Sequence, residues 1–455
     1  MTQEAEKLNK EKNQLFNDVY NNTIPKRVPI RFGLQNNVFA EYIGINSAEG
    51  LWNPSLLLDA ALELAARIPT DTNIYYGMNL SPNYLQAWDS TSKKMSRDGT
   101  VQYLNVPSLF AEDYEAFIKN AYDCIIERAI PRLYTGLDFY KDPGRAMIAM
   151  SIGKDAKVRH LMEDSAVARA VKEKFGGWEP PADVQTSIIA PFDYLGDNLW
   201  TLKAIVGDIR RIPEKVDAAL ESLYPLNYFA GIPFRITNDS FTHYNFHQPT
   251  FMRDKDFQRF YWKHFLRQTN DYASLGIHTS IFLEHNWMNR LDYLLDLPVN
   301  TRLNFEVCDP MPVKEKLGSK FILSGGFPLE TLRLYSREEC IARVKDFLDI
   351  MMPGGNYLFG FDKSPFGIGD ANLDKLQAVC ETVRDYGVYK NAGEKTGMEF
   401  HKEDYKHSEY VPFTSKYYRT WEQTKELYPL TPESAKKEVM DMEKTMVKFI
   451  YDLVR

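Results

Sequence analysis

Short apolar runs alternate with longer helical segments along most of this 455-residue chain, and this alternation limits the possible folds more than any other feature. Strands that are separated by helices pair in parallel, because the chain must cross back before the next strand can form. Six or more such units predict an α/β fold of the (β/α)8 TIM-barrel type. An open doubly wound sheet is the alternative, although no GxGxxG follows the first predicted strand.

The predicted strands are short and are bounded by Gly, Pro, Asn or Asp. The first two are RVPIRFG (27–33) and NIYYGMNL (73–80), and the helical segment NPSLLLDAALELAARI (53–68) lies between them. Each later run is followed by residues with helical spacing. These later strands are TSIIAPFD (186–193), GIPFRITND (231–239), IHTSIFLEHN (277–286), RLNFEVCD (302–309), KFILSGGF (320–327) and NYLFGF (356–361).

The chain divides into two parts at about residue 390. Residues 1–390 hold a helical N-terminal lead-in and all the predicted strands, so they form the predicted barrel domain. Residues 391–455 are polar and aromatic without a clear period, until the amphipathic helix predicted in PESAKKEVMDMEKTMVKFIYDLVR. We expect this C-terminal extension to pack on the barrel or to form a subunit contact, as in a homodimer.

Charge and composition exclude several classes of protein. A net charge of −7 and a pI near 5.8 argue against a nucleic-acid partner. The four cysteines lie far apart without a CxxC, so they predict neither a disulfide framework nor a cysteine-rich zinc cluster. The charged, helical N-terminus does not resemble a signal peptide, and no apolar run is long enough to span a membrane. A soluble cytoplasmic enzyme is therefore expected.

Polar residues follow three consecutive predicted strands. In a parallel barrel the carboxyl ends of the strands meet at one mouth, where the reacting groups of such enzymes lie. We therefore expect a site there. Its candidates are Asp239, His243, Tyr244 and His247 after the first of these strands, Glu284, His285, Asn286 and Trp287 after the second, and Glu306, Cys308 and Asp309 after the third.

These residue types fit either a metal site or metal-free acid/base catalysis. Glu284, His247 and Cys308 would suit zinc or a similar metal, whereas Glu284, His243, His247, Glu306 and Asp309 are the candidate catalytic groups. Each residue also has a structural alternative. Glu284 could pair with Arg290, either histidine could pack against the backbone, Cys308 could be a small buried apolar residue, and Asp309 could cap a helix.

Several longer motifs resemble the uroporphyrinogen decarboxylase superfamily, over roughly residues 20–388. This superfamily includes tetrapyrrole decarboxylases and corrinoid-linked methyltransferases on a (β/α)8 barrel. The motifs occur in the expected order. They are APFDYLGDNLW (190–200), FQRFYWKHF (257–265), FLEHNWMNRLDYLLDLP (282–298), VKEKLGSKFILSGGFP (313–328), and PGGNYLFG (353–360) followed by LDKLQAVCETVRDYG (373–387).

Departures from the family patterns select a subgroup. The first strand, RVPIRFGLQNN, lacks the Arg-Gln-Ala-Gly-Arg-Tyr pattern that clamps porphyrinogen carboxylates. Thiol-methylating members carry His-x-Cys and a later Cys as a zinc site, but this chain has Glu284-His285-Asn286 and no later Cys in PGGNY. Phe282, Glu284 and the following RLDYL resemble the methyltransferases of anaerobic O-demethylase systems.

The resemblance implies transfer of a methyl group from a phenyl methyl ether, such as guaiacol or veratrole, to cob(I)alamin on a separate corrinoid protein. Zinc is a further cofactor that the site could take. The aromatic ring of the donor needs apolar walls and polar contacts to orient it. The candidates for these substrate contacts are Phe32, Asp239, Tyr244, Phe246, Asn286 and Trp287.

Two other functions remain open. A decarboxylase of a smaller acid would need a cationic clamp, for which Arg31, Arg235 and Arg302 are the strand-borne candidates. A barrel that catalyses no reaction and only binds a corrinoid protein would instead have Glu284 and the histidines in internal hydrogen bonds.

Overall fold

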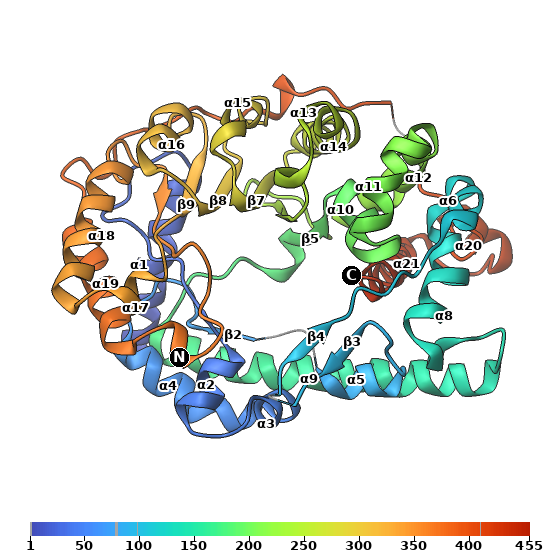
Figure 1. Cartoon of the computed structure of the whole chain (residues 1–455), viewed down its shortest axis with the longest axis horizontal. Helices are drawn as coiled ribbons and strands as arrows, with labels where there is room; N and C mark the ends of the chain where they lie inside the picture. Colours follow the sequence, from blue (N-terminus) through green and yellow to red (C-terminus); the bar gives the residue numbers. More distant parts are fainter. Residues whose placement is uncertain (1, 78–80, 98, 410) are drawn as a thin grey trace.

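The computed structural model describes residues 2–77, 81–97, 99–409 and 411–455. Its centre is a sheet of six parallel strands that neighbour one another in chain order. The strands form an arc with helices on its outer side (Figure 1). They are β5 (Gln185–Ile189), β6 (Phe241–Phe246), β7 (His278–Asn286), β8 (Arg302–Val307), β9 (Ile322–Gly325) and β10 (Tyr357–Leu358).

The first predicted strand, at 27–33, forms only isolated bridges, whereas the second contains β2 (Tyr75–Tyr76), which pairs in parallel with the two residues that follow the first, β1 (Leu34–Gln35). Single parallel bridges connect them to the rest, from Ile30 to Phe359 and from Thr72 to Trp178. Within the described residues the strands therefore do not form one continuous eight-stranded sheet, and the closed barrel stays a prediction. The parallel α/β arrangement itself is confirmed. Residues 78–80 of the second predicted strand lie outside the described residues.

Side chains of β6 alternate between two environments, as a strand requires. Thr242, Tyr244 and Phe246 are buried, and the Tyr244 hydroxyl donates to Gln268 of α14 (Lys263–Ser274) at 3.0 Å. His243 and Asn245 point the other way and are only half-buried. We call this second side, which faces away from the helices, the inner face of the sheet.

The strand predicted at 231–239 is wrong, because helix α12 (Pro213–Gly231) runs to Gly231 and a loop follows. Pro233 has no N–H to donate to a sheet ladder. Thr237 and Ser240 close a turn, in which the Ser240 amide donates to the Thr237 carbonyl at 3.0 Å. The strand starts at Phe241, so Asp239 precedes it and lies exposed at the end opposite His247.

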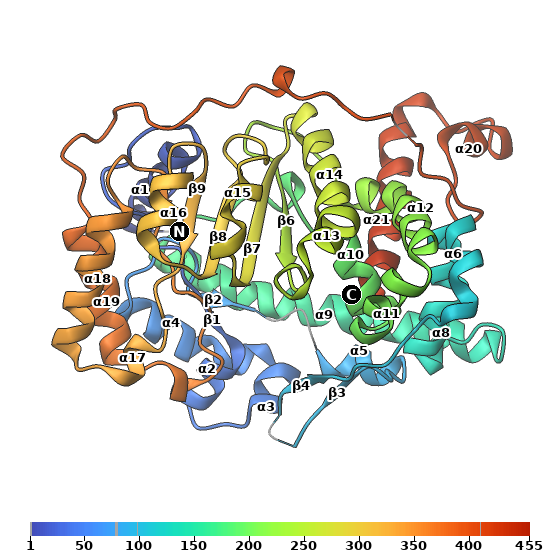
Figure 2. The ribbon, with the colours of Figure 1, turned by 45° about the horizontal axis from the view of Figure 1, so that its top comes forward.

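The outer helices follow the predicted spacing. Those that connect or flank the sheet include α4 (Leu58–Arg67), α11 (Leu202–Arg211), α13 (Asp254–Asp256), η8 (Phe257–Trp262), α15 (Leu291–Leu294), α16 (Pro310–Leu317), α18 (Arg337–Met351) and α19 (Leu373–Tyr386). Helix α9 (Pro143–Phe175) is the longest of those described, with 33 residues, and runs along one side of the molecule in Figure 1 and across the middle of Figure 2. No helix in the described ranges has the length and apolarity needed to cross a membrane.

Helix α1 (Gln3–Tyr20) packs at the amino-terminal end of the strands. Its Phe16 and Tyr20 are buried in a small cluster with Ile322 and Leu358. Phe16 also stacks on Trp178, with 4.4 Å between ring centroids. The helical lead-in expected from the sequence therefore contributes core side chains beneath the sheet.

The C-terminal extension first crosses the surface as irregular chain, seen along one edge of Figure 2, and then forms α20 (Trp421–Leu427) and α21 (Lys436–Leu453). The predicted final helix is thus confirmed. Tyr451 stacks on Tyr194 at 4.5 Å, and its hydroxyl accepts from the Ile189 amide at 3.0 Å. These contacts bring the end of the chain next to β5, although the division into two domains at residue 390 stays a prediction.

Candidate active site

Acids and an imidazole meet at the carboxyl end of β7 and β8. Glu284 and His285 belong to the last residues of β7, and Glu306 to β8. One ligand atom from each of the three lies within 4.8 Å of the others. The Glu306 carboxylate accepts from the His285 amide at 2.6 Å, and Glu284 Oε1 lies 3.6 Å from His285 Nε2. We call these three residues the rim cluster.

A backbone irregularity in β7 brings Glu284 and His285 to the same place. Consecutive residues of a regular strand point to opposite faces. Here the register with β8 shifts between Leu283 and Asn286, and His285 adopts a φ of 63°. Such a left-handed residue within a bulge re-aims its side chain. The imidazole of His285 can therefore approach both carboxylates.

His247 lies next to the rim cluster, just after β6. Its Nδ1 lies 2.8 Å from Oδ2 of Asp197, and its Nε2 lies 3.4 Å from Oε2 of Glu284. Burial lowers the pKa of His247, but the hydrogen bond with Asp197 and the charges of Asp193, Asp197 and Glu284 outweigh burial and raise this pKa to about 9. His247 is therefore protonated at neutral pH.

Asp193 hydrogen-bonds the backbone at His247. Its carboxyl group is fully buried and accepts from the His247 amide at 3.2 Å, the Gln248 amide at 3.1 Å and the Tyr261 hydroxyl at 2.6 Å. Burial and the charge of Asp197 raise the pKa of Asp193 to about 7. Asp193 thus fixes the position of the backbone at His247 and Gln248.

The Glu284 side chain keeps 29% of its surface exposed. Burial raises the pKa of Glu284, while the positive charges of His247 and His285 oppose that shift. The predicted alternative partner, Arg290, instead donates to the carbonyl groups of Pro249 and Met252. Glu284 is therefore not paired with Arg290, and its carboxylate can contact a ligand at the carboxyl end of the sheet.

His243 lies deeper, within β6 and four positions before His247. Its Nδ1 lies 3.1 Å from Ser280 Oγ and its Nε2 lies 3.1 Å from Asn245 Oδ1. Burial, followed by the charge of Arg31, lowers the pKa of His243 to about 4, so the ring is neutral at pH 7. The structure therefore does not bring His243 to the rim cluster.

Cys308 and Asp309 lie beyond β8 and have local roles. Asp309 caps α16, and its carboxylate accepts from the Met311 amide at 3.3 Å, as the structural alternative predicted. Cys308 packs its sulfur so closely over Gly326 that an added Cβ there would lie 2.5 Å away. Burial raises the pKa of the Cys308 thiol to about 12. Neither residue belongs to the rim cluster.

The predicted aromatic walls pack against other aromatic rings, three of them on the helix side of the sheet. Tyr244 packs edge-to-face on Phe265 at 4.9 Å, and Phe246 packs on the same ring at 4.6 Å. Trp287 is fully buried, and its indole N–H donates to the Glu284 carbonyl at 3.0 Å. Phe32 packs against Phe361, with 5.1 Å between ring centroids. Their placement supports a packing role and does not support contact with a substrate at the rim cluster.

Neither predicted polar contact, Asn286 or Asp239, joins the rim cluster with its side chain. Asn286 Oδ1 accepts from the Met288 amide at 2.9 Å and so begins the short turn after β7. Asp239 lies at the amino-terminal end of β6. Three residues at the site were not among the candidates for catalysis or metal binding: Asp193, Asp197 and His285. A signal existed for two of them, since Asp193 and Asp197 follow the β5 run directly.

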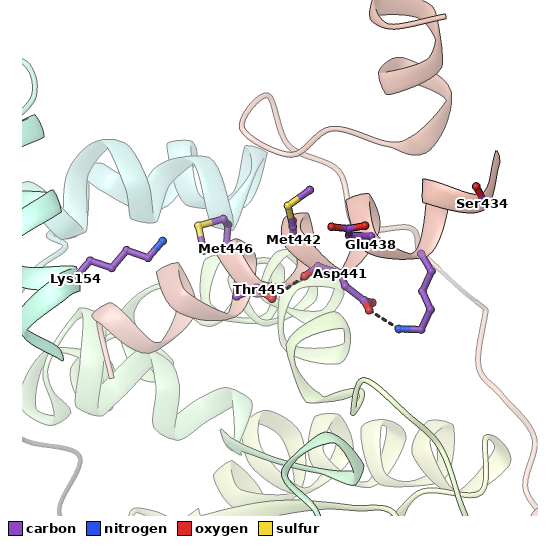
Figure 3. A pocket seen from close by; sticks show the side chains of 8 residues that line it. Lys154, Ser434, Glu438, Asp441, Met442, Thr445 and Met446 are labelled. Carbon is purple, nitrogen blue, oxygen red and sulfur yellow. Dashed lines mark hydrogen bonds and ion pairs between the residues drawn. The ribbon is translucent and has the colours of Figure 1, made fainter. Parts of the chain in front are cut away.

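A surface pocket of about 750 Å³ lies between α9 and α21, and none of its lining residues belongs to the strands of the sheet. In Figure 3 its lining side chains come mainly from one face of α21, with Lys154 reaching in from α9. Asp441 pairs there with Lys437, and its carbonyl accepts from Thr445. The lining holds acids, lysine and methionine but no imidazole, and it shares no residue with the rim cluster.

Comparison with known proteins gives little further information. No family model matches the chain, and no curated protein does. Among solved structures the chain is similar to a methyltransferase from Methanosarcina mazei, with 14% sequence identity, 83% of this chain and 98% of that chain covered, and a TM-score of 0.48. Because the TM-score is this low, the site is interpreted from its own geometry.

Proposed function

We propose that the protein is a methyltransferase that takes a methyl group from a small phenyl methyl ether, such as guaiacol or veratrole, and passes it to cob(I)alamin on a corrinoid protein. The observation that carries the proposal is the rim cluster with His247 beside it. An ether oxygen is a poor leaving group unless it is protonated or bound to a cation. This edge of the sheet offers groups that could protonate the ether oxygen and groups that could bind a cation.

The rim cluster fits a divalent cation such as zinc. One imidazole and two carboxylates are a donor set that zinc accepts, and their ligand atoms lie within 4.8 Å of one another. Glu284, His285 and Glu306 would hold the cation. A bound cation would polarise the ether oxygen as a Lewis acid.

His247 would supply the proton. Its raised pKa keeps a proton on the ring at pH 7, and the hydrogen bond with Asp197 fixes the ring so that Nε2 points toward Glu284. When the bond between the methyl carbon and the ether oxygen breaks, the electron pair stays on oxygen, which takes the proton from His247. The methyl group passes to the corrinoid, and His247 regains a proton from solvent.

A role as a non-catalytic partner of a corrinoid protein is less well supported. That role expects Glu284 and the histidines to be enclosed in internal hydrogen bonds. The side chains of His247 and His285 are each 43% exposed instead. Groups that are open to solvent at the carboxyl ends of parallel strands fit a site better than a scaffold.

A decarboxylase of a small acid is the second candidate. Arg31 favours it, because its positive charge lowers the pKa of His243 and could attract a carboxylate, whereas the Arg302 guanidinium lies over the rings of Tyr20 and Phe241. Arg235, the third predicted clamp residue, pairs with Asp183 at the surface at 2.6 Å instead.

A visible-spectrum assay under strict reduction tests the proposal. The protein is mixed with cob(I)alamin, or with its corrinoid protein, and with guaiacol or veratrole. Loss of the cob(I) band together with growth of methylcobalamin and free phenol is expected. Sensitivity to a chelator then decides between a cation and His247 as the main electrophile. No transfer from any methoxyarene in the presence of a competent corrinoid protein would reject the proposal.

A further inference from the structure

Helix α9 has an exposed face that is rich in apolar side chains. Met147, Ile148, Ile152, Val158 and Met162 lie on it, with exposed fractions from 47% for Val158 to 68% for Met162. Ile148 lies beside Ile152, and Val158 beside Met162, because residues four apart are neighbours on a helix. Single exposed apolar residues are common, whereas a contiguous group of them marks a surface that another molecule covers.

Six exposed residues of α9 form a row with the spacing of a coiled-coil seam. They are separated by alternating steps of four and three residues, which keeps them on one line along the helix. The row consists of Ile148, Ile152, Asp155, Arg159, Met162 and Ala166, and we call it the α9 seam. Its two ends are apolar and its centre is charged. Within one chain Asp155 and Arg159 form an ion pair at 2.5 Å, and both side chains are mostly exposed.

The α9 seam is complementary to a second copy of itself in antiparallel orientation. With a two-fold axis beside Lys157, residues equally far before and after this position face each other. Ile148 then faces Ala166, Ile152 faces Met162, and Asp155 faces Arg159, each pair occurring twice. In a parallel pair of seams Asp155 would face Asp155, and Arg159 would face Arg159, so like charges would repel. The positions of the two charges therefore select the antiparallel arrangement.

The apolar surface continues from α9 onto α21. A stable protein interface buries about 800 Å² on each partner, which is more than one row of side chains supplies. Exposed Met442 and Met446 of α21 line the pocket into which Lys154 of α9 reaches (Figure 3). Methionine side chains are flexible and adapt to the surface that packs on them. The two helices together therefore offer a broader apolar surface than the seam alone.

We propose that the exposed face of α9 is an interface between two copies of this chain, in which the two α9 seams pack antiparallel across a two-fold axis near Lys157. The apolar pairs at both ends of the seam supply affinity, and the two pairs of Asp155 with Arg159 fix orientation and register. The inference does not depend on the proposed methyl transfer. It moves the main subunit contact from the C-terminal extension, where the sequence suggested one, to α9.

Sedimentation velocity of the full chain at several concentrations tests this interface. The wild type is expected to sediment as a particle of twice the 52.7 kDa mass of one chain. Ile152→Glu places a charged group opposite Met162 and should weaken the dimer by at least about 100-fold. Ile236→Glu is the matched control, because Ile236 is 45% exposed and lies outside α9. This control should leave the dimer intact.

Two charge variants test the contact between Asp155 and Arg159. Asp155→Arg and Arg159→Asp should each be monomeric, because each brings like charges together twice across the axis. An equimolar mixture of these two variants should form a heterodimer, since every arginine of one chain then faces an aspartate of the other. Neither variant keeps the ion pair within its own helix, so recovery in the mixture reports the contact between chains.

Cysteine pairing tests the orientation. A mixture of Ile152→Cys and Met162→Cys should give a disulfide-linked dimer under mild oxidation. Neither variant alone should do so, because two copies of position 152 would lie about 15 Å apart along the helices. A wild type that stays monomeric, a dimer that Ile152→Glu leaves unchanged, or a charge mixture that stays monomeric would overturn the inference. Circular dichroism of each variant separates a lost interface from a lost fold.

Discussion

The Nδ1 atom of His247 lies 2.8 Å from Oδ2 of Asp197, although the two residues are 50 positions apart in the chain. This contact is a main reason for the raised pKa of His247, against the opposing effect of burial. A charged imidazole can donate a proton, whereas a neutral one held by the same contact would not. The pair therefore determines which form of His247 meets the donor.

Asp197→Asn should lower the pKa of His247 from about 9 toward its ordinary value. The amide keeps the shape of the side chain but removes the negative charge that favours the imidazolium. NMR titration of the ring of His247 measures the shift directly. Asp183→Asn serves as the control, because Asp183 pairs with Arg235 at the surface. An unchanged titration in Asp197→Asn would contradict the assignment.

The same pKa predicts how stability depends on pH. The folded-state pKa of about 9 exceeds the unfolded value near 6.5, so the stabilisation from His247 is fully present below about pH 6.5 and is lost as the pH rises through 9. Urea denaturation of wild type and His247→Gln measures it. The difference in the free energy of unfolding between them should shrink across this window. A difference that grows would contradict the prediction.

The comparison with His247→Gln is needed because other groups titrate in the opposite sense. Burial lowers the pKa of several lysines to about 8, which makes the protein more stable as the pH rises above that value. The wild type alone would report the sum of both effects. These lysines, Lys93, Lys314, Lys444 and Lys448, are shared by both proteins and cancel in the difference.

Zinc binding should depend on the rim cluster. Glu284→Gln and Glu306→Gln each remove a charged oxygen ligand, so each should weaken zinc affinity by at least about 10-fold in a competition assay with a metal-binding dye. Cys308→Ser should leave the affinity unchanged, because the thiol is protonated and packs on Gly326. Loss of zinc binding in Cys308→Ser would instead favour the thiolate site that the sequence suggested.

Tyr244→Phe should destabilise the fold. Its hydroxyl donates to Gln268 at 3.0 Å in the buried layer between sheet and helix, so the change leaves the Gln268 oxygen without its donor. A loss of about 1–3 kcal/mol in the free energy of unfolding is expected. Tyr76→Phe is the matched control, because Tyr76 is 67% exposed. No loss in Tyr244→Phe would mean that the Tyr244 hydroxyl does not form the stabilising hydrogen bond to Gln268.

The sequence predicted the elements whose signal is local. Short apolar runs marked β7 and β8, and helical spacing marked α11 and α21, since each pattern lies within the segment that folds. β6 was misplaced because the apolar residues of GIPFRITND alternate as those of a strand do, and only Pro233 and the turn at Thr237 argue against a strand there. That one shift moved Asp239 to the wrong end of the strand and turned Tyr244 from a site residue into a core residue.

By itself the sequence determined the parallel α/β class, most of the helices and the position of Glu284 and Glu306 at strand ends, because periodicity and strand direction are properties of short segments. Only the tertiary structure decided that Asp197 reaches His247, that a bulge turns His285 toward Glu306, and that Arg455 returns to Ser187. These contacts join residues that are far apart in the chain. Their geometry depends on how whole strands and helices pack, which no local pattern encodes.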